Sequence, residues 1–142
     1  MVSLWVLDTD HISELQRRNP RIIERIARIS PENLAVTIIT IEEQVRGRLD
    51  VIRRAEQANN ALLVQSYARL RETINFFKNL CVLDFDQEAG NYYTELKRQK
   101  IRIGTQDLKI ASIVLSQQAI LVTRNRKDFE KIPSLLIEDW TI

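Results

Sequence analysis

Five short apolar runs alternate with longer stretches of helical periodicity, and this alternation constrains the fold more than any other feature. The runs cover residues 4–7, 34–39, 80–85, 120–123 and 135–137. They are apolar without alternation and bounded by polar residues, which is typical of strands buried on both faces of a sheet. Helical periodicity covers residues 11–18, 21–29, 40–57, 60–78, 87–100 and 106–117. The sequence therefore predicts an α/β fold in which helices enclose a five-stranded, mostly parallel sheet.

The whole chain, residues 1–142, is expected to form one domain. Its length and its 44% apolar composition suffice for one sizeable core, and no stretch rich in Pro, Gly or Ser divides it. No apolar run approaches the roughly 20 residues that a membrane span needs. The N-terminus also lacks a basic segment followed by a signal-length apolar run, so a cytoplasmic location without a membrane partner is expected.

Several residue types are too scarce for common catalytic sites. Cys81 is the only cysteine and His11 the only histidine, which excludes an internal disulfide and a thiolate metal cage. The three glycines lie far apart and form no phosphate-binding loop. The net charge of +2 leaves the partner open, although basic patches could still be local. If the chain is an enzyme, carboxylates must carry its reaction.

The first apolar run ends on Asp8, and Asp10 follows two positions later. In an open α/β sheet the ligand crevice lies at the carboxyl ends of the strands, so Asp8 is a candidate site residue. The alternative is that Asp8 or Asp10 caps the helix that follows, because Asp is a favoured N-cap residue. Taken alone, this stretch favours neither interpretation.

A second carboxylate, Asp107, lies three, four and seven residues before Ile110, Ala111 and Val114. It therefore shares a helical face with residues expected in the core. The alternative is that Thr105 caps this helix and that Asp107 only complements the helix dipole in the first turn. An inward-facing carboxylate is better explained by a functional site.

Two adjacent glutamates begin the helix that follows the second apolar run. Thr40 and Glu43 fit the pattern of a capping box, T-x-x-E. Glu42 lies nearer the apolar side of this helix than Glu43 does, whereas Gly47, four residues beyond Glu43, leaves open space on the side of Glu43. Helical phase alone leaves open which glutamate faces a site.

Polar side chains also follow the fourth apolar run, where VTRNRKDF contains Thr123, Asn125 and Asp128. A turn with an Asn or Asp cap is the alternative there. If the strand order is 3-2-1-4-5, the first and fourth strands are neighbours, and Asp8 and this segment flank one crevice. Converging carboxylates repel one another unless a hard divalent cation such as Mg²⁺ or Mn²⁺ neutralises them. Such a site suits the hydrolysis of phosphodiesters.

Five segments together resemble a known family of nucleases. LDTDHIS, ITIEEQVRG, IGTQDLKIAS, LVTRNRKDFEKIP and LLIEDW occur in the order and spacing of a PIN-domain nuclease of the VapC toxin type. The resemblance spans essentially the whole chain. It implies a three-layer α/β/α fold and an endoribonuclease that depends on Mg²⁺ or Mn²⁺. It also implies a homodimer and a cognate VapB-type antitoxin whose tail occupies the active-site groove.

The resemblance also assigns roles to the candidate residues. Asp8, Glu43 and Asp107 match the metal-binding acids of the family, so the resemblance selects Glu43 over Glu42. The fourth position varies in such proteins: Asp128 is the acidic candidate and Asn125 the neutral one, with Thr123 in support. Asp10 and Glu42 are candidates for auxiliary roles. The alternatives are a helix cap for Asp10 and a solvated charge for Glu42. Five arginines flank these motifs and are candidates for holding RNA, or else are ordinary solvated residues: Arg46, Arg48, Arg102, Arg124 and Arg126.

Two other functions remain open at this stage. Asp8 and Asp10 also resemble the aspartyl-phosphate motif of haloacid-dehalogenase-like phosphatases, with Thr123 in their second motif. Ile12 stands where that family has Thr or Val, and only fifteen positions separate Thr123 from Glu138, too few for its remaining motifs. The non-enzymatic alternative is a PIN-like module that binds RNA or a protein partner without cleaving.

Overall fold

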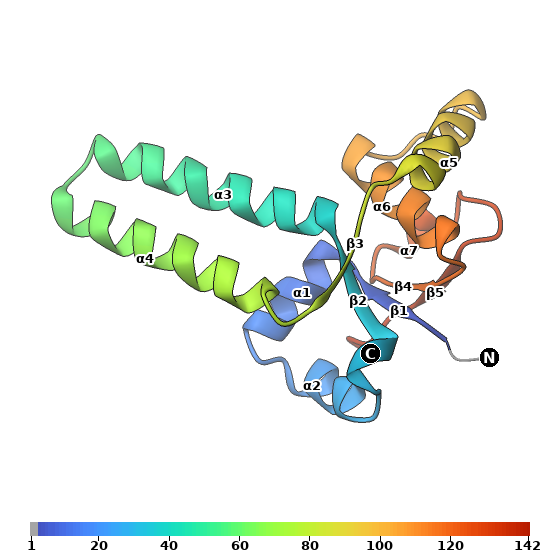
Figure 1. The fold of residues 1–142 in the computed structure, drawn as a ribbon, viewed down its shortest axis with the longest axis horizontal. Coiled ribbons are helices and arrows are strands. Elements are labelled where there is room, and N and C mark those ends of the chain that lie inside the picture. Colours follow the sequence, from blue (N-terminus) through green and yellow to red (C-terminus); the bar gives the residue numbers. More distant parts are fainter. Residues whose placement is uncertain (1–2) are drawn as a thin grey trace.

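The computed structural model describes residues 3–142 and contains one sheet of five parallel strands in the order β3-β2-β1-β4-β5 (Figure 1). This confirms the predicted α/β class, strand order and parallel pairing. The strands are β1 (Trp5–Leu7), β2 (Leu34–Thr37), β3 (Cys81–Leu83), β4 (Ile120–Val122) and β5 (Leu136–Glu138). Because β1 pairs with both β2 and β4, the ends of the central strands lie side by side.

Helices surround the sheet and divide the interior into two cores. They are α1 (Thr9–Gln16), α2 (Pro20–Ala27), α3 (Ile38–Glu56), α4 (Asn60–Phe77), α5 (Gln87–Arg98), α6 (Thr105–Ser116) and the short α7 (Arg126–Phe129). Val6 packs with residues of α5 and α6, whereas its neighbour Leu7 packs with residues of α1, α2 and the end of α4. Successive strand residues point to opposite faces, so this division shows the expected three layers.

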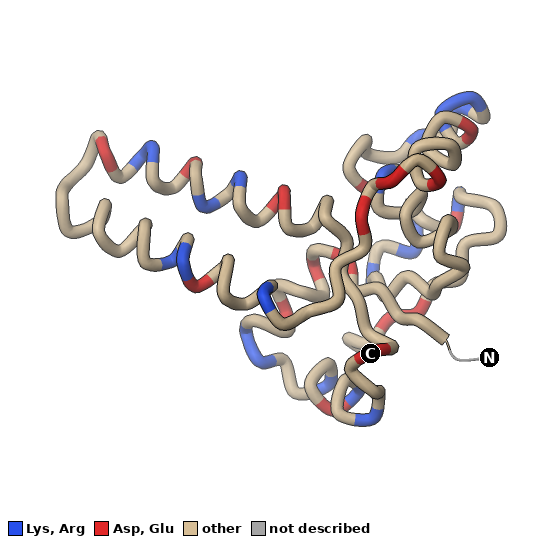
Figure 2. The backbone as a smooth tube through the Cα atoms, viewed as in Figure 1, with Lys and Arg blue, Asp and Glu red and all other residues tan. Residues whose placement is uncertain are grey.

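The two longest helices, α3 and α4, form an antiparallel hairpin that projects beyond the sheet (Figure 1). Only the base of this hairpin lies against the body of the molecule, where α3 contacts α1 and α6. Figure 2 shows acidic and basic residues interspersed along α3. Among residues 3–142, no helix is both long and apolar enough to cross a membrane.

Several predicted boundaries are wrong because a capping residue ends the strand or begins the helix earlier than periodicity suggests. The apolar run 34–39 divides at Thr37, whose side chain accepts the backbone N–H of Thr40 and begins α3. Thr40 therefore lies inside the helix, and the predicted capping box with Glu43 does not form. Likewise, Gly104 is the N-cap of α6, so Thr105 is its first helical residue and not its cap.

Candidate active site

An acidic pocket of about 280 Å³ lies at the carboxyl ends of β1 and β4, the edge of the sheet where the sequence predicted a site. Segments far apart in the chain meet there: the start of α1, the first half of α3, the first turn of α6 and the segment after β4. The pocket is lined by Asp8, Thr9, Asp10, Ser13, Glu43, Asp107, Asn125 and Phe129.

Asp8 joins the pocket to both the sheet and α1. Its backbone N–H donates to the carbonyl of Val122 at 3.0 Å, which continues the pairing of β1 with β4. Its Oδ1 accepts the backbone N–H of His11 at 2.8 Å, so Asp8 is the N-cap of α1. The two alternative roles of Asp8, helix cap and pocket residue, therefore coexist in one side chain.

The buried imidazole of His11 holds Asp8 in place. Its Nδ1 lies 3.2 Å from Oδ1 of Asp8, and its Nε2 accepts the backbone N–H of Trp140 at 3.2 Å. Because Nε2 acts as an acceptor, the ring proton lies on Nδ1 and is donated to Asp8. His11 is therefore a positioning residue, linking the end of the chain to a carboxylate of the pocket.

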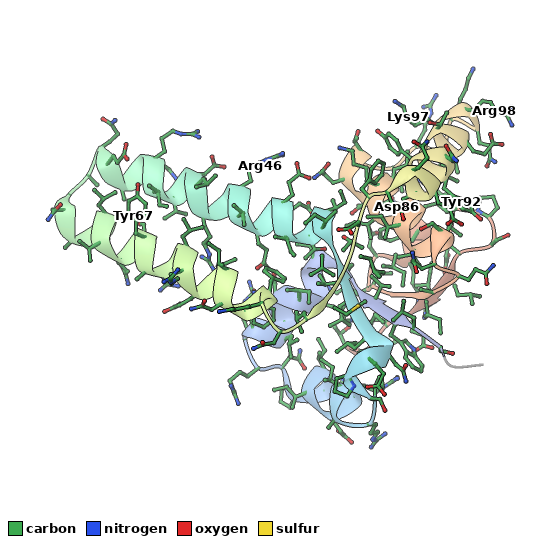
Figure 3. The ribbon with its side chains drawn as sticks, viewed as in Figure 1. Arg46, Tyr67, Asp86, Tyr92, Lys97 and Arg98 are labelled. Carbon is green, nitrogen blue, oxygen red and sulfur yellow. The ribbon has the colours of Figure 1, made fainter. Side chains whose placement is uncertain are left out.

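The two glutamates at the start of α3 have different surroundings. Glu43 enters the pocket, and its Oε1 accepts the hydroxyl of Thr9 at 2.6 Å. Glu42 pairs with Arg46 at 2.6 Å and accepts Gln106 at 3.0 Å. Figure 3 shows Arg46 pointing away from α4 on the outer side of the hairpin. Glu43 is thus the glutamate that the structure brings into the pocket.

The pKa of Asp107 responds to the negative charges of the other predicted acids. Burial, followed by the negative charges of Glu43, Asp8 and Asp128, raises the pKa of Asp107 from 3.8 to about 6. These causes show that Asp8, Glu43, Asp107 and Asp128 share one electrostatic site. A carboxylate that is destabilised by like charges is suited to binding a cation.

The segment after β4 supplies the fourth position through a pair of side chains. Asn125 lines the pocket, and its Nδ2 donates to Oδ2 of Asp128 at 3.1 Å. The other carboxylate oxygen of Asp128, Oδ1, lies 3.8 Å from Nζ of Lys131. Thr123 supports the turn by accepting the backbone N–H of Asn125 at 3.0 Å. Asn125 thus lines the pocket itself, whereas Asp128 acts on it through its charge, which contributes to the raised pKa of Asp107.

The donor atoms of the pocket fit a hard divalent cation in their chemistry. Carboxylate oxygens of Asp8, Glu43 and Asp107 face the same cavity, and hard cations prefer oxygen ligands. Within residues 3–142, no three acidic, histidine or cysteine side chains are already gathered around a metal position. Asp8, Glu43 and Asp107 would hold a cation, whose charge would offset the repulsion that Asp107 experiences from its neighbours.

Comparisons with known proteins agree with this fold and site. Ribonuclease VapC1 of Haemophilus influenzae strain R2866 is 31% identical over 143 residues, covering 97% of this chain and 98% of the relative. The chain belongs to the VapC ribonuclease family. The tRNA(fMet)-specific endonuclease VapC of Salmonella typhimurium is 28% identical over 140 residues, covering 96% and 97%. The solved structure of VapBC-1 from nontypeable Haemophilus influenzae superposes with a TM-score of 0.75 and 29% identity, covering 98% and 99%.

No model of a known protein family matches the chain, so its assignment to the VapC family depends on the relatives that match it along its whole length. This membership contradicts the haloacid-dehalogenase-like alternative. The likeness is not confined to one motif, because it covers 97% of this chain in the Haemophilus relative and 98% in the solved structure.

Most arginines that flank the motifs of this VapC chain form ion pairs with neighbouring carboxylates. Arg46 pairs with Glu42, Arg124 pairs with Asp10 at 2.6 Å, and Arg126 lies 3.9 Å from Glu130. The pair with Arg124 draws Asp10 to the rim, where it still lines the pocket. Roles in RNA binding for these arginines, and for Arg102, stay predictions.

Sequence reasoning missed two positioning residues of the VapC site. His11 has a local signal, since it lies three residues after an N-cap Asp, where side chains commonly reach back to the cap. Thr9 has none, because its partners Thr40 and Glu43 are more than thirty residues away in the chain. Only the packing of α1 against α3 reveals that contact.

Proposed function

We propose that this VapC-family protein is a metal-dependent endoribonuclease, the toxin of a VapBC-type pair. The observation that carries the proposal is the acidic pocket, in which burial and three other carboxylates raise the pKa of Asp107. The names of the relatives from Haemophilus and Salmonella support ribonuclease activity. Mg²⁺ or Mn²⁺ is the proposed cofactor because the donor atoms are all oxygens.

The residues of the pocket divide the work of hydrolysis. Asp8, Glu43 and Asp107 would hold the cation, which when bound activates water and stabilises charge on the phosphate. His11 keeps Asp8 oriented, and Thr9 does the same for Glu43. Water attacks the phosphorus and the bond to the 3′ oxygen breaks, leaving a 5′ phosphate and a 3′ hydroxyl.

The proposed partners follow from the same family. A VapB-type antitoxin is the proposed protein partner, because the Haemophilus structure that matches the whole chain is that of VapBC-1. The homodimer expected from the resemblance remains part of this proposal. An RNA substrate also implies action in the cytoplasm.

Cleavage of total RNA by the purified protein tests the proposed function. Wild type and the Asp107→Asn variant are incubated with Mg²⁺, with Mn²⁺ or with a chelator, and new 5′ ends are mapped. Asp50→Asn is the matched control, because Asp50 is exposed on α3 and, among residues 3–142, forms an ion pair only with Arg53 at 3.4 Å. We expect discrete ends that require metal with wild type and with Asp50→Asn, and none with Asp107→Asn.

A non-cleaving RNA-binding module is the second candidate, favoured by the finding that the neutral Asn125, and not Asp128, lines the pocket in the segment after β4. Tight RNA binding by folded protein, without new ends under any metal condition, would support this candidate and contradict the nuclease.

A further inference from the structure

We infer that a second pocket, lined by four arginines, binds the phosphate backbone of the RNA beside the acidic pocket. The inference rests on the proposed function, because it concerns RNA as the substrate. This pocket has a volume of about 720 Å³ and is lined by residues of α1, of the turn after it and of both helices of the α3–α4 hairpin. It is lined by Ser13, Leu15, Gln16, Arg17, Arg18, Gln44, Gly47, Arg48, Arg69, Glu72, Thr73 and Phe76. We call it the arginine pocket.

The arginine pocket adjoins the acidic pocket. Ser13 of α1 lines both cavities, and its hydroxyl accepts Gln44 at 3.5 Å from α3. One turn further along α1, Gln16 and Gln44 exchange hydrogen bonds at 2.8 and 3.1 Å and form the floor between the two helices. A strand of RNA with one phosphate among the carboxylates can therefore continue past Ser13 toward the arginines.

The arginines of this pocket carry charge that their neighbours leave free. The lining has four arginines against one glutamate, Glu72. Arg17 pairs with Glu14 at 3.2 Å, whereas the other three form no ion pair within residues 3–142. This contrasts with Arg46 and Arg124, whose charges are matched at 2.6 Å. The lining of the arginine pocket therefore carries a net positive charge.

Arg48 is the residue best prepared to receive a phosphate. Its Nε donates to the hydroxyl of Thr73 at 2.9 Å, and that hydroxyl donates to the carbonyl of Arg69 at 3.0 Å. This chain of bonds fixes the half-buried guanidinium and leaves its terminal N–H groups for a ligand. Planar guanidinium groups with parallel N–H bonds match phosphate oxygens.

The composition of the lining favours RNA over a protein segment. Leu15 and Phe76 are the only large apolar residues of its twelve lining residues, whereas the buried centre of a protein interface is mostly apolar. The cavity is open beside Gly47, because a Cβ added there would meet no atom within 4 Å. The result is a wide, polar and cationic channel adjoining the proposed cleavage site.

RNA binding by full-length Asp107→Asn protein tests this inference without cleavage. The probe is a fluorescent single-stranded RNA of mixed sequence, and the dissociation constant is measured over a range of salt concentrations. Replacing Arg48 and Arg69 with Ala should weaken binding about tenfold and lower the salt slope by about 1.4, since each phosphate contact on single strands contributes about 0.7. Arg28→Ala with Arg53→Ala, two exposed arginines elsewhere, removes the same charge and should change neither value as much.

A second pair of variants separates blocking from misfolding. Gly47→Glu places a negative charge in the arginine pocket, and Gly47→Gln adds a side chain of the same size without charge. Both residues favour helix more than Gly does, so the fold is retained. We expect Gly47→Glu to weaken RNA binding about tenfold more than Gly47→Gln.

Three outcomes would overturn the inference. The first is unchanged RNA affinity in both the arginine variants and Gly47→Glu while wild type still cleaves RNA. The second is that Gly47→Glu converts a dimer into a monomer in sedimentation with unaltered RNA affinity, which would assign the pocket to a second copy. The third is that these variants abolish binding of a VapB-type peptide but not of RNA. By contrast, weaker binding in the variants with no cleavage by wild type would contradict only the nuclease proposal.

Discussion

The acidic pocket and the arginine pocket share Ser13 but are built in different ways. The acidic pocket stands on the sheet, where Asp8 follows β1 directly and Asn125 follows β4 by a short turn. The arginine pocket is lined by helices and by the turn after α1, which carries Arg17 and Arg18, and Arg48 and Arg69 belong to opposite arms of the hairpin. The acidic pocket depends on the strand order, whereas the arginine pocket depends on how the helices pack.

This difference separates what each pocket can do. Strand ends in a parallel sheet are rigid and close together, which suits the positioning of reacting groups. The long helices of the hairpin contact the rest of the molecule only at their base. They present separated charges on a larger surface, which suits an extended polyanion. The comparison predicts that variants of the acidic pocket change the rate of cleavage, whereas variants of the arginine pocket change the affinity for RNA.

The largest expected effect distinguishes the two adjacent glutamates of α3. Glu43→Gln should slow cleavage more than about 100-fold, because second-layer partners of metal ligands alone are typically worth 10- to 100-fold. Glu42→Gln removes only the exposed pair with Arg46 and should change the rate less than about threefold. Single-turnover cleavage at saturating RNA measures both. Equal losses in the two variants would mean that the acidic pocket extends to the outer face of α3.

The next effect concerns the stability of the acidic pocket without metal. The pKa of Asp107 is about 6 in the folded protein against 3.8, so wild type loses stability as the pH rises through this range. Asp107→Asn has no charge to desolvate and should be more stable near neutral pH by about 1 to 2 kcal/mol, after allowance for solvent screening. Denaturant unfolding in chelator measures the gap, which should vanish near pH 4. A gap that does not vary with pH would show that neither burial nor the neighbouring carboxylates raise the pKa of Asp107.

The two pockets also differ in how far the sequence predicts them. The strand order and the ends of the strands follow from short apolar runs, so Asp8 could be placed at the carboxyl edge in advance. Asp107 could be placed by helical phase, because its neighbours Ile110 and Ala111 are buried as expected. Thr37 was missed as a helix cap because it lies inside a continuous apolar run, and periodicity does not register a cap.

Contacts between distant helices were not predictable. The hydrogen bond from Thr9 to Glu43 and the meeting of Arg48 with Thr73 depend on how α1 and α4 pack against α3. On sequence alone, Arg69 is one more polar residue of a solvated amphipathic helix. Of the arginine pocket, the sequence therefore offered only Arg48 as a candidate for holding RNA. All three proposed metal ligands were candidates, although only the family resemblance selected Glu43 over Glu42.

A smaller effect tests whether His11 acts through Asp8. Asn can present an N–H close to the position of Nδ1, whereas Gln extends toward the position of Nε2. We expect His11→Gln to slow cleavage about tenfold and to need more Mn²⁺ for half-maximal rate, as is typical of lost second-layer contacts. His11→Asn should recover part of both. If the two variants lose stability and activity in the same proportion at every Mn²⁺ concentration, His11 serves the core and not the acidic pocket.

The smallest effect tests why Gly47 stands inside α3. Glycine in a helix interior costs roughly 0.5 to 1 kcal/mol relative to alanine, and a Cβ at this position would meet open space. Gly47→Ala should therefore raise the melting temperature by about 2 to 4 °C, as expected for 1 kcal/mol in a chain of this size. Gly90→Ala in α5 is the control and should give a similar gain, because its Cβ would meet only Phe85 at 3.9 Å. A gain at both positions would show that neither helix backbone requires glycine. A loss at Gly47 alone would show that a Cβ is not accommodated there, which would contradict the open space beside this residue in the arginine pocket.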